Sequence, residues 1–206
     1  MYNIHKTAII GTGYWGSVIV NTLIKITKKK IFIYDKLKEN SSLLKKKFND
    51  RIFVANNYNE ILKNQNIKNV ILATHPSINY FLGKKVLSYN KNLFVEKPIV
   101  TEPKKLSELI KLAKKKNKIL MGGYIYLYNS YIKKIKKIIQ NNELGNIKYV
   151  EIQRKNLGPI RNEIDSHLDL GSHDLSILKF LFNKKIKINN LIKRNILKKN
   201  ISDITS

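Results

Sequence analysis

The chain has 206 residues, of which 43% are hydrophobic, and 40 lysines and arginines stand against 14 aspartates and glutamates. This length and apolar fraction suffice for one ordinary domain and part of a second, which excludes a disordered tail. The absence of cysteine excludes disulfides, thiolate metal sites and a cysteine nucleophile. No apolar stretch approaches the roughly 20 residues that span a bilayer, and the N-terminus lacks a signal peptide's long apolar region. We expect a soluble cytoplasmic protein with no membrane partner.

The net charge of +26 comes almost entirely from lysine, because arginine occurs only as Arg51, Arg154, Arg161 and Arg194. Lysine, asparagine and isoleucine fill 93 of the 206 positions, and A/T-rich codons encode all three. Most of the charge is therefore interpreted as a chain-wide bias of composition. Bidentate arginine contacts are the commonest way in which proteins recognise specific bases, and arginine is scarce here. The aromatic residues lie within apolar runs, whereas proteins that bind single strands interleave them with basic residues. No specific nucleic-acid partner is expected.

Short β-branched runs alternate with longer stretches of helical period from Lys6 onward, a pattern typical of a parallel sheet wrapped by helices. The predicted strands are Thr7–Ile10, Ile31–Tyr34, Arg51–Val54, Asn69–Ala73, Leu93–Val95 and Ile119–Met121. Helices fill the gaps, including one from about Pro103 to Lys116 with an apolar stripe. Residues 1–122 are therefore predicted to form an α/β domain with a doubly wound parallel sheet of the Rossmann type.

The pattern changes after residue 122. A predicted helix, Ser130–Asn141, is followed by a predicted strand, Ile147–Arg154, and then by a loop and a helix over Leu170–Phe182. One or two more strands are expected from Ile186 onward. Residues 123–206 are therefore predicted to form a second, α+β domain that either is incomplete or has its sheet covered by a partner. The apolar side chains of Ile147–Arg154 predict a sheet face that a second subunit covers or that, left bare, makes the chain poorly soluble, and a homo-oligomer is expected.

A glycine loop, Gly11-Thr12-Gly13-Tyr14-Trp15-Gly16, lies directly between the first predicted strand and a helical run. A pyrophosphate site requires strand, loop and helix in this order. Gly11 permits the tight turn, Gly13 the close approach of the backbone to phosphate, and Gly16 the packing of helix on strand. The N-H groups at the start of the helix then face the phosphate charge. The alternative is a glycine-rich turn that binds no ligand.

Asp35 ends the second predicted strand, nineteen residues after Gly16. A carboxylate there can accept hydrogen bonds from both ribose hydroxyls of NAD and would repel a 2′-phosphate. Lys36 follows directly and could pair with the 2′-phosphate of NADP, so this cofactor stays open as the alternative. Asp35 could also be a solvated residue at the end of a strand. NAD is the predicted cofactor.

Three side chains are candidates for proton and charge chemistry. Lys97 follows the fifth predicted strand at the carboxyl end of the sheet, where it could stabilise the alkoxide-like charge that develops as hydride leaves a carbon. Asp169 and His173 are four residues apart at the start of a helix, so the carboxylate could orient an imidazole that moves the hydroxyl proton. A solvated lysine and a helix cap are the alternatives. No metal is expected, because His167, Asp169 and His173 have no evident further ligand.

Together these motifs resemble the family of NAD(P)-dependent sugar dehydrogenases that includes glucose-fructose oxidoreductase, inositol dehydrogenase and MocA. The resemblance runs over nearly the whole chain. It is carried by Gly-x-Gly-Tyr-Trp-Gly at 11–16, Ala73-Thr74 before a proline, Glu96-Lys97-Pro98, Gly123-Tyr124 with Tyr128-Asn129, Glu143-Leu144-Gly145-Asn146-Ile147, and Asp169-Leu170-Gly171-Ser172-His173-Asp174. It implies a catalytic set of Lys97, Asp169 and His173. It also implies that residues 1–122 are an NAD(P)-binding Rossmann domain and that residues 123–206 are a truncated α+β domain for substrate binding and dimerisation.

The resemblance also implies which residues contact each ligand. The cofactor contacts that we expect are Gly11, Gly13, Tyr14, Trp15, Gly16, Asp35, Thr74, Pro76, Glu96 and Lys97. The substrate contacts that we expect are Lys97, Tyr124, Arg154, Arg161, Asp169 and His173. The segment holding Arg154 and Arg161 looks most like the branch that acts on nucleotide-activated amino sugars, such as UDP-N-acetylglucosamine 3-dehydrogenases. These arginines would then meet a phosphate or carboxylate, and a structural ion pair is the alternative.

Two departures from the family pattern bear on function. Thr74-His75-Pro76-Ser77 replaces the usual proline and histidine after the fourth strand, and the chain ends where the family's large open sheet would begin. The implied function is transfer of hydride between a nicotinamide cofactor and a hydroxyl of a sugar, nucleotide sugar or cyclitol. The alternative is a non-catalytic dinucleotide-binding regulatory or partner subunit, or an inactive shortened family member.

Overall fold

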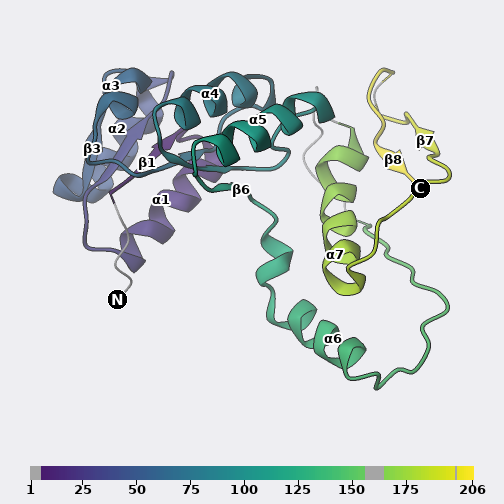
Figure 1. Cartoon of the computed structure of the whole chain (residues 1–206). Coiled ribbons are helices and arrows are strands. Elements are labelled where there is room, and N and C mark those ends of the chain that lie inside the picture. The colour runs from purple at the N-terminus through teal and green to yellow at the C-terminus, as the bar shows by residue number, and fades with distance from the viewer. Residues whose placement is uncertain (1–5, 156–164, 198) are drawn as a thin grey trace. The chain divides into compact units, whose positions relative to one another are not determined.

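A six-stranded parallel sheet organises the N-terminal part of the chain (Figure 1). The computed structural model describes residues 6–155, 165–197 and 199–206. The chain divides into two units, Met1–Gly123 and Tyr124–Ser206. The sheet belongs to the first unit.

The strand order of the sheet is β3-β2-β1-β4-β5-β6, and every neighbouring pair is parallel. The strands are β1 (Thr7–Ile10), β2 (Ile31–Tyr34), β3 (Ile52–Val54), β4 (Asn69–Leu72), β5 (Asn92–Val95) and β6 (Leu120–Gly122). The connecting helices are α1 (Tyr14–Ile26), α2 (Lys38–Phe48), α3 (Tyr58–Lys63), α4 (Pro76–Ser88) and α5 (Pro103–Lys115), and Arg51 falls in a 3-10 turn, η1 (Asn49–Arg51). This order confirms the predicted doubly wound Rossmann fold.

The strand β1 is buried along its whole length, because it has a hydrogen-bonded neighbour on each side and an apolar cluster on each face. Successive side chains of a strand point to opposite faces. Ile9 therefore joins a cluster with residues of α1 and α2, whereas Ala8 and Ile10 join a larger cluster with residues of α3, α4 and α5. The central position of β1 sets the place where the following loop emerges.

The described part of the second unit is mainly helical. Its elements are a 3-10 turn η2 (Ile125–Tyr128), α6 (Ser130–Gln140), a π-helical turn η3 (His167–Gly171), α7 (Ser172–Phe182), β7 (Lys193–Arg194) and β8 (Ile204–Thr205). The two short strands pair antiparallel, and α6 and η2 both pack against α7. Within the described ranges, no helix is both long and apolar enough to cross a membrane.

The predicted strand Ile147–Arg154 is wrong. The structure shows this stretch as part of an irregular loop after α6 (Figure 1). Tyr149 is 79% exposed, and Val150 and Ile152 are also exposed. A strand needs a neighbour to exchange backbone hydrogen bonds with, and none of the described segments pairs with this one. The one or two strands expected after Ile186 are confirmed as the short ladder of β7 and β8.

Lys91 is a buried lysine of the first unit whose ammonium group binds two backbone carbonyl oxygens. The side chain is only 2% exposed, and its Nζ donates hydrogen bonds of 2.8 Å to the carbonyl oxygens of Asn64 and Ile67. Burial lowers the pKa of Lys91, and the charge of Lys68 lowers it further. The ammonium group ties the start of β5 to the loop before β4.

Lys91→Met is expected to destabilise the protein by about 1–3 kcal/mol, because it keeps the aliphatic stem but leaves two acceptors without their donor. Urea unfolding followed by far-UV circular dichroism measures this change. The control Lys63→Met changes an exposed lysine and should alter stability by no more than about 0.5 kcal/mol. Equal unfolding midpoints for the two variants would contradict the role given to Lys91.

Candidate functional site

The glycine loop lies where the strand order reverses, between β1 and β4. Gly11 has a φ of +90°, and a Cβ placed on it would lie 2.5 Å from the carbonyl oxygen of Ala73. A Cβ on Gly16 would lie 2.0 Å from the carbonyl oxygen of Gly11. No other residue type fits at either position without a shift of backbone. Gly11 and Gly16 are thus required for the loop to pack on itself and on the end of β4.

Gly13 has a different environment. A Cβ on Gly13 would meet nothing within 4 Å, and its φ of −62° is open to any residue. Gly13 is also the N-cap residue of α1, which has neither a side-chain cap nor an acidic residue in its first turn. The helix N-terminus therefore lies beside open space without a negative charge of its own, a setting suited to a phosphate.

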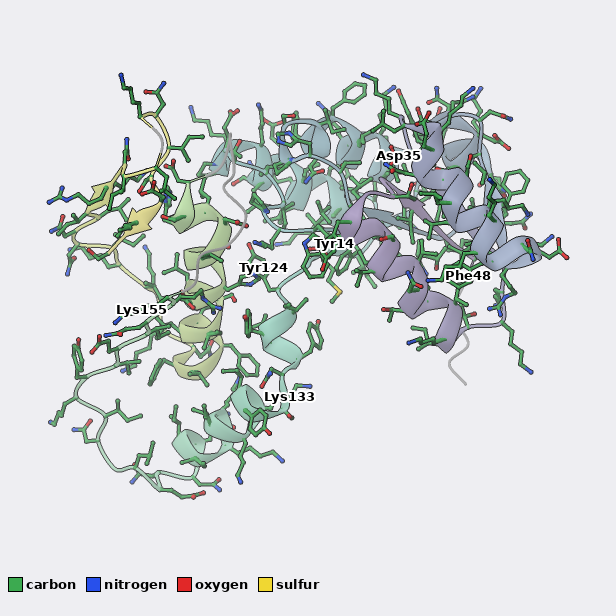
Figure 2. All side chains as sticks on the ribbon, turned by 180° about the vertical axis from the view of Figure 1, so that it is seen from behind. Tyr14, Asp35, Phe48, Tyr124, Lys133 and Lys155 are labelled. Carbon is green, nitrogen blue, oxygen red and sulfur yellow. The ribbon has the colours of Figure 1, made fainter. Side chains whose placement is uncertain are left out.

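Two residues of this loop carry exposed aromatic rings. Tyr14 and Trp15 begin α1, and Figure 2 labels Tyr14 at that end of the helix. Tyr14 is 77% and Trp15 44% exposed. Their ring centroids are 5.5 Å apart in an edge-to-face arrangement. Together they offer an apolar surface next to the uncapped end of α1.

Asp35 anchors the loop to the end of β2, a role that sequence reasoning missed. The backbone N-H of Thr12 donates to Asp35 Oδ2 at 2.5 Å, and the Thr12 hydroxyl donates to the same oxygen at 3.2 Å. The N-H of Leu37 donates to Oδ1 at 2.9 Å. A carboxylate has about four lone-pair sites, so Asp35 retains capacity for further donors. Contact with a ribose stays a prediction.

The segment after β4 is tied to Pro98 through Asn79, which sequence reasoning also missed. The Thr74 hydroxyl donates to Asn79 Oδ1 at 2.6 Å, and Asn79 Nδ2 donates to the carbonyl oxygen of Pro98 at 3.3 Å. His75 is the N-cap of α4, where its Nδ1 accepts from the N-H of Ser77, and Pro76 is the first residue of the helix. The departure from the family pattern at His75 thus has a structural reason, helix capping.

Glu96 and Lys97 follow β5 at the carboxyl edge of the sheet, and a cis peptide bond joins Lys97 to Pro98. The Glu96 carboxylate lies against Gly123, where an added Cβ would be 2.8 Å from Oε2. Burial raises the pKa of Glu96, and the backbone N-H and the charge of Lys97 offset part of the increase. The candidate catalytic lysine is therefore next to a carboxylate that is poorly solvated.

The other candidate acid–base residues belong to the second unit. Asp169 lies in the π-helical turn η3, and His173 lies in the first turn of α7, where it is 7% exposed. Single π-helical turns within helices are frequent at functional sites. In the described residues, no group of three or more histidine, aspartate or glutamate side chains is arranged to hold a metal ion.

Arg154 makes the ion pair that the sequence left open as the alternative to a substrate contact. Its Nη2 and Nε donate to Asp174 Oδ1 at 2.8 and 3.1 Å, and its Nη1 donates to the hydroxyl of Tyr126 at 2.9 Å. Tyr124 contributes to a pocket of about 440 Å³ on α7, and burial raises the pKa of its phenol. Arg161 lies outside the described residues.

The structure therefore groups the predicted site residues within each unit. Gly11, Gly16, Asp35 and Thr74 meet around the glycine loop, and Lys97 follows the neighbouring strand. Asp169, His173, Tyr124 and Arg154 belong to the second unit.

The comparisons with known proteins agree with this fold. The family model for Gfo/Idh/MocA proteins, described as "Oxidoreductase family, NAD-binding Rossmann fold", matches residues 5–124. The chain is similar to the uncharacterized oxidoreductase YrbE of Bacillus subtilis, with 20% identity over 185 residues that cover 87% of this chain and 54% of that protein. It is also similar to the myo-inositol 2-dehydrogenase of Thermotoga maritima, with 20% identity over 190 residues, 88% of this chain and 56% of that protein. The chain spans about half the length of these curated relatives.

A solved structure supports the same architecture. The NAD-binding protein from Listeria innocua matches with a TM-score of 0.85 and 22% sequence identity, covering 97% of this chain and 61% of that chain. At this level of identity, the likeness shows that the two proteins share a fold.

Glu96→Gln is expected to change how stability depends on pH. The pKa of Glu96 is raised above its ordinary value of 4.5 in the folded state, so the folded protein holds this proton more tightly than the unfolded chain does. Stability should therefore fall as the pH rises from about 4.5 through the raised pKa. The glutamine variant lacks this contribution.

Urea unfolding of both proteins from acidic to neutral pH measures the effect, and the Glu96→Gln variant should gain stability over wild type as the pH rises. Glu39→Gln serves as the control, because it neutralises an exposed carboxylate in the first turn of α2. A constant difference between wild type and Glu96→Gln at every pH would refute the raised pKa.

Proposed function

Because the chain belongs to the Gfo/Idh/MocA oxidoreductase family with its NAD-binding Rossmann fold, we propose that it transfers hydride between a nicotinamide cofactor and a hydroxyl of a sugar, nucleotide sugar or cyclitol. The observation that carries the proposal is the uncapped N-terminus of α1 at Gly13, beside open space at the point where the strand order reverses. Ligands of open α/β sheets bind at this switch point.

The residues around the loop fit a dinucleotide. The backbone at Gly13 and the first turn of α1 would bind the pyrophosphate, and the rings of Tyr14 and Trp15 would shield it from water. Asp35 would accept one ribose hydroxyl on the lone pair of Oδ1 that Thr12 and Leu37 leave open. This carboxylate favours NAD, and Lys36 is the residue that would favour NADP instead. When bound, the cofactor supplies or accepts the hydride.

In this proposal, Lys97 holds the reacting hydroxyl of the substrate and stabilises the negative charge that develops on its oxygen. His173 accepts the hydroxyl proton during oxidation and returns it during reduction, and Asp169 orients the imidazole. The carboxyl edge of the sheet supplies Lys97, and the start of α7 supplies His173.

The substrate class is proposed from likeness and chemistry together. The matched relative from Thermotoga maritima is a myo-inositol 2-dehydrogenase. Sugars, nucleotide sugars and cyclitols all present a secondary hydroxyl, which is the group that a lysine and a histidine can bind and deprotonate. A homo-oligomer and a cytoplasmic location remain predictions from the sequence.

A second candidate function is binding of a dinucleotide without turnover. It is favoured by the described part of the second unit, whose strands form only the short β7–β8 ladder. Both candidates require the same cofactor site and differ in whether a substrate is converted.

Gly13→Ala should abolish or strongly weaken NADH binding while leaving stability unchanged, because its Cβ has room in the free protein but would occupy the space of the phosphate. Isothermal titration calorimetry measures affinity, and urea unfolding measures stability. Gly16→Ala is the contrasting variant, because its Cβ would collide with the backbone of Gly11, so stability should fall as well.

No heat of binding from wild-type protein with millimolar NADH or NADPH would sink the dinucleotide assignment. Tighter binding of NADPH than of NADH would show that Lys36, and not Asp35, determines which cofactor is preferred. NADH binding by Gly13→Ala at wild-type affinity would show that phosphate does not lie at this residue.

Lys97→Met and His173→Gln should each lower turnover by about 10² or more while NADH affinity stays near that of wild type, because acid–base groups typically contribute 10² to 10⁴. The assay follows nicotinamide absorbance with NAD⁺ and a panel of myo-inositol, glucose and UDP-N-acetylglucosamine. Lys104→Met, which changes an exposed lysine of α5, should keep full activity. NADH binding without turnover on a broad panel would favour the second candidate function.

A further inference from the structure

We infer that Arg154 and Tyr126 are positioning residues that hold the imidazole of His173 in one orientation for proton transfer. The inference rests on the proposed function, in which His173 moves the proton of the substrate hydroxyl. All the residues involved belong to the second unit. Their contacts form a closed sequence from His173 to Tyr126, Arg154 and Asp174 and back along α7.

The first contact joins His173 to Tyr126. The His173 side chain is buried in the first turn of α7. Its ring centroid is 4.9 Å from that of Tyr126, at an interplanar angle of 73°. Aromatic rings prefer this edge-to-face geometry, which is specific in angle as well as distance. The plane of the Tyr126 ring therefore limits the rotation of the imidazole.

The second contact holds Tyr126 in place. The guanidinium carbon of Arg154 lies 4.7 Å from the centroid of the Tyr126 ring, and Arg154 Nη1 donates to the Tyr126 hydroxyl at 2.9 Å. A cation over the face and a hydrogen bond at the tip restrict the same ring in two directions. Tyr126 lies in the short turn η2. Its ring is therefore oriented by these two side-chain contacts with Arg154.

The third contact returns to the helix that carries His173. Arg154 binds Asp174, the next residue after His173, through Nη2 at 2.8 Å and Nε at 3.1 and 3.3 Å. The hydrogen bonds to Asp174, and to a lesser extent to Tyr126, raise the pKa of Arg154. Because Asp174 and His173 are fixed to the same helical turn, Arg154 positions the Tyr126 ring relative to the imidazole.

The chemistry of the contacts requires arginine rather than lysine. A planar guanidinium can bind a carboxylate with two nitrogens while a third nitrogen reaches a hydroxyl, whereas an ammonium group is a single point of charge. The chain has 40 basic residues and only four arginines, so arginine at this position runs against its composition. The presence of arginine agrees with the need to bind Asp174 and Tyr126 at the same time, which a lysine ammonium group cannot do in this geometry.

The test compares Arg154→Lys, Tyr126→Leu and Tyr126→Phe with wild type. Arg154→Lys keeps the charge and loses the fork, Tyr126→Leu removes the ring, and Tyr126→Phe keeps the ring and loses the hydroxyl. We expect kcat to fall by about tenfold to 10² in the first two variants and less in Tyr126→Phe, because small misplacements of a catalytic group cost this much. KM for NAD⁺ and for the substrate should stay unchanged.

A second measurement does not depend on turnover. The linewidths of the imidazole NMR signals report exchange between ring orientations, and His173→Gln assigns the His173 signals among those of the four histidines. Wild type should show one set of sharp His173 signals, and Arg154→Lys and Tyr126→Leu should show signals broadened by exchange between orientations. The control Arg194→Lys replaces the exposed arginine of β7 and should change neither kcat nor the His173 signals.

The outcomes separate this inference from the proposed function. Absence of turnover in wild type would remove the proposed function, and the NMR comparison would still decide whether His173 is positioned. Wild-type NMR signals in folded Arg154→Lys and Tyr126→Leu would overturn the inference. A rise in KM for the substrate at constant kcat would also overturn it, because Arg154 would then bind the substrate itself.

Discussion

The close approach of the glycine loop to the end of β4 is the constraint on which the candidate cofactor site depends. Gly11 and Gly16 leave no room for a Cβ between the loop and Ala73, so the chain can turn from β1 into α1 within a few residues. This short turn places the uncapped start of α1 at the point where the strand order reverses. Asp35 adds a second constraint, because its bond to Thr12 ties the loop to β2.

The fold and the family were predictable from the sequence because both depend on local patterns. The strands of the first unit are short apolar runs that are buried on both faces, and the glycine loop carries its own turn and helix start. The segment Ile147–Arg154 was not predictable in the same way. Its composition suits a strand, but strand formation depends on a neighbour that the local sequence does not specify.

The hydrogen-bond partners of the site residues could not be predicted from the sequence, for a related reason. Thr12 and Asp35 are 23 positions apart, and Arg154 and Asp174 are 20 apart, so no helical or strand period links either pair. The value of Arg154 was evident from the scarcity of arginine, but its contact with Tyr126 depends on how the loop after α6 returns to α7. Asn79, which joins Thr74 to Pro98, gave no signal at all.

The anchoring of that loop has a consequence for local opening. The bond from Arg154 to the Tyr126 hydroxyl closes a segment that contains α6 and the irregular loop 141–155, and closing a flexible loop of that length costs on the order of 2 kcal/mol of chain entropy. The guanidinium contacts must offset this cost, since the loop from Asn141 to Lys155 contains no helix or strand. Ions in solution screen this ion pair only in part, because its side chains are 24% and 20% exposed. High salt therefore weakens the attachment of this loop more than it weakens the sheet of the first unit, which buried apolar contacts hold together.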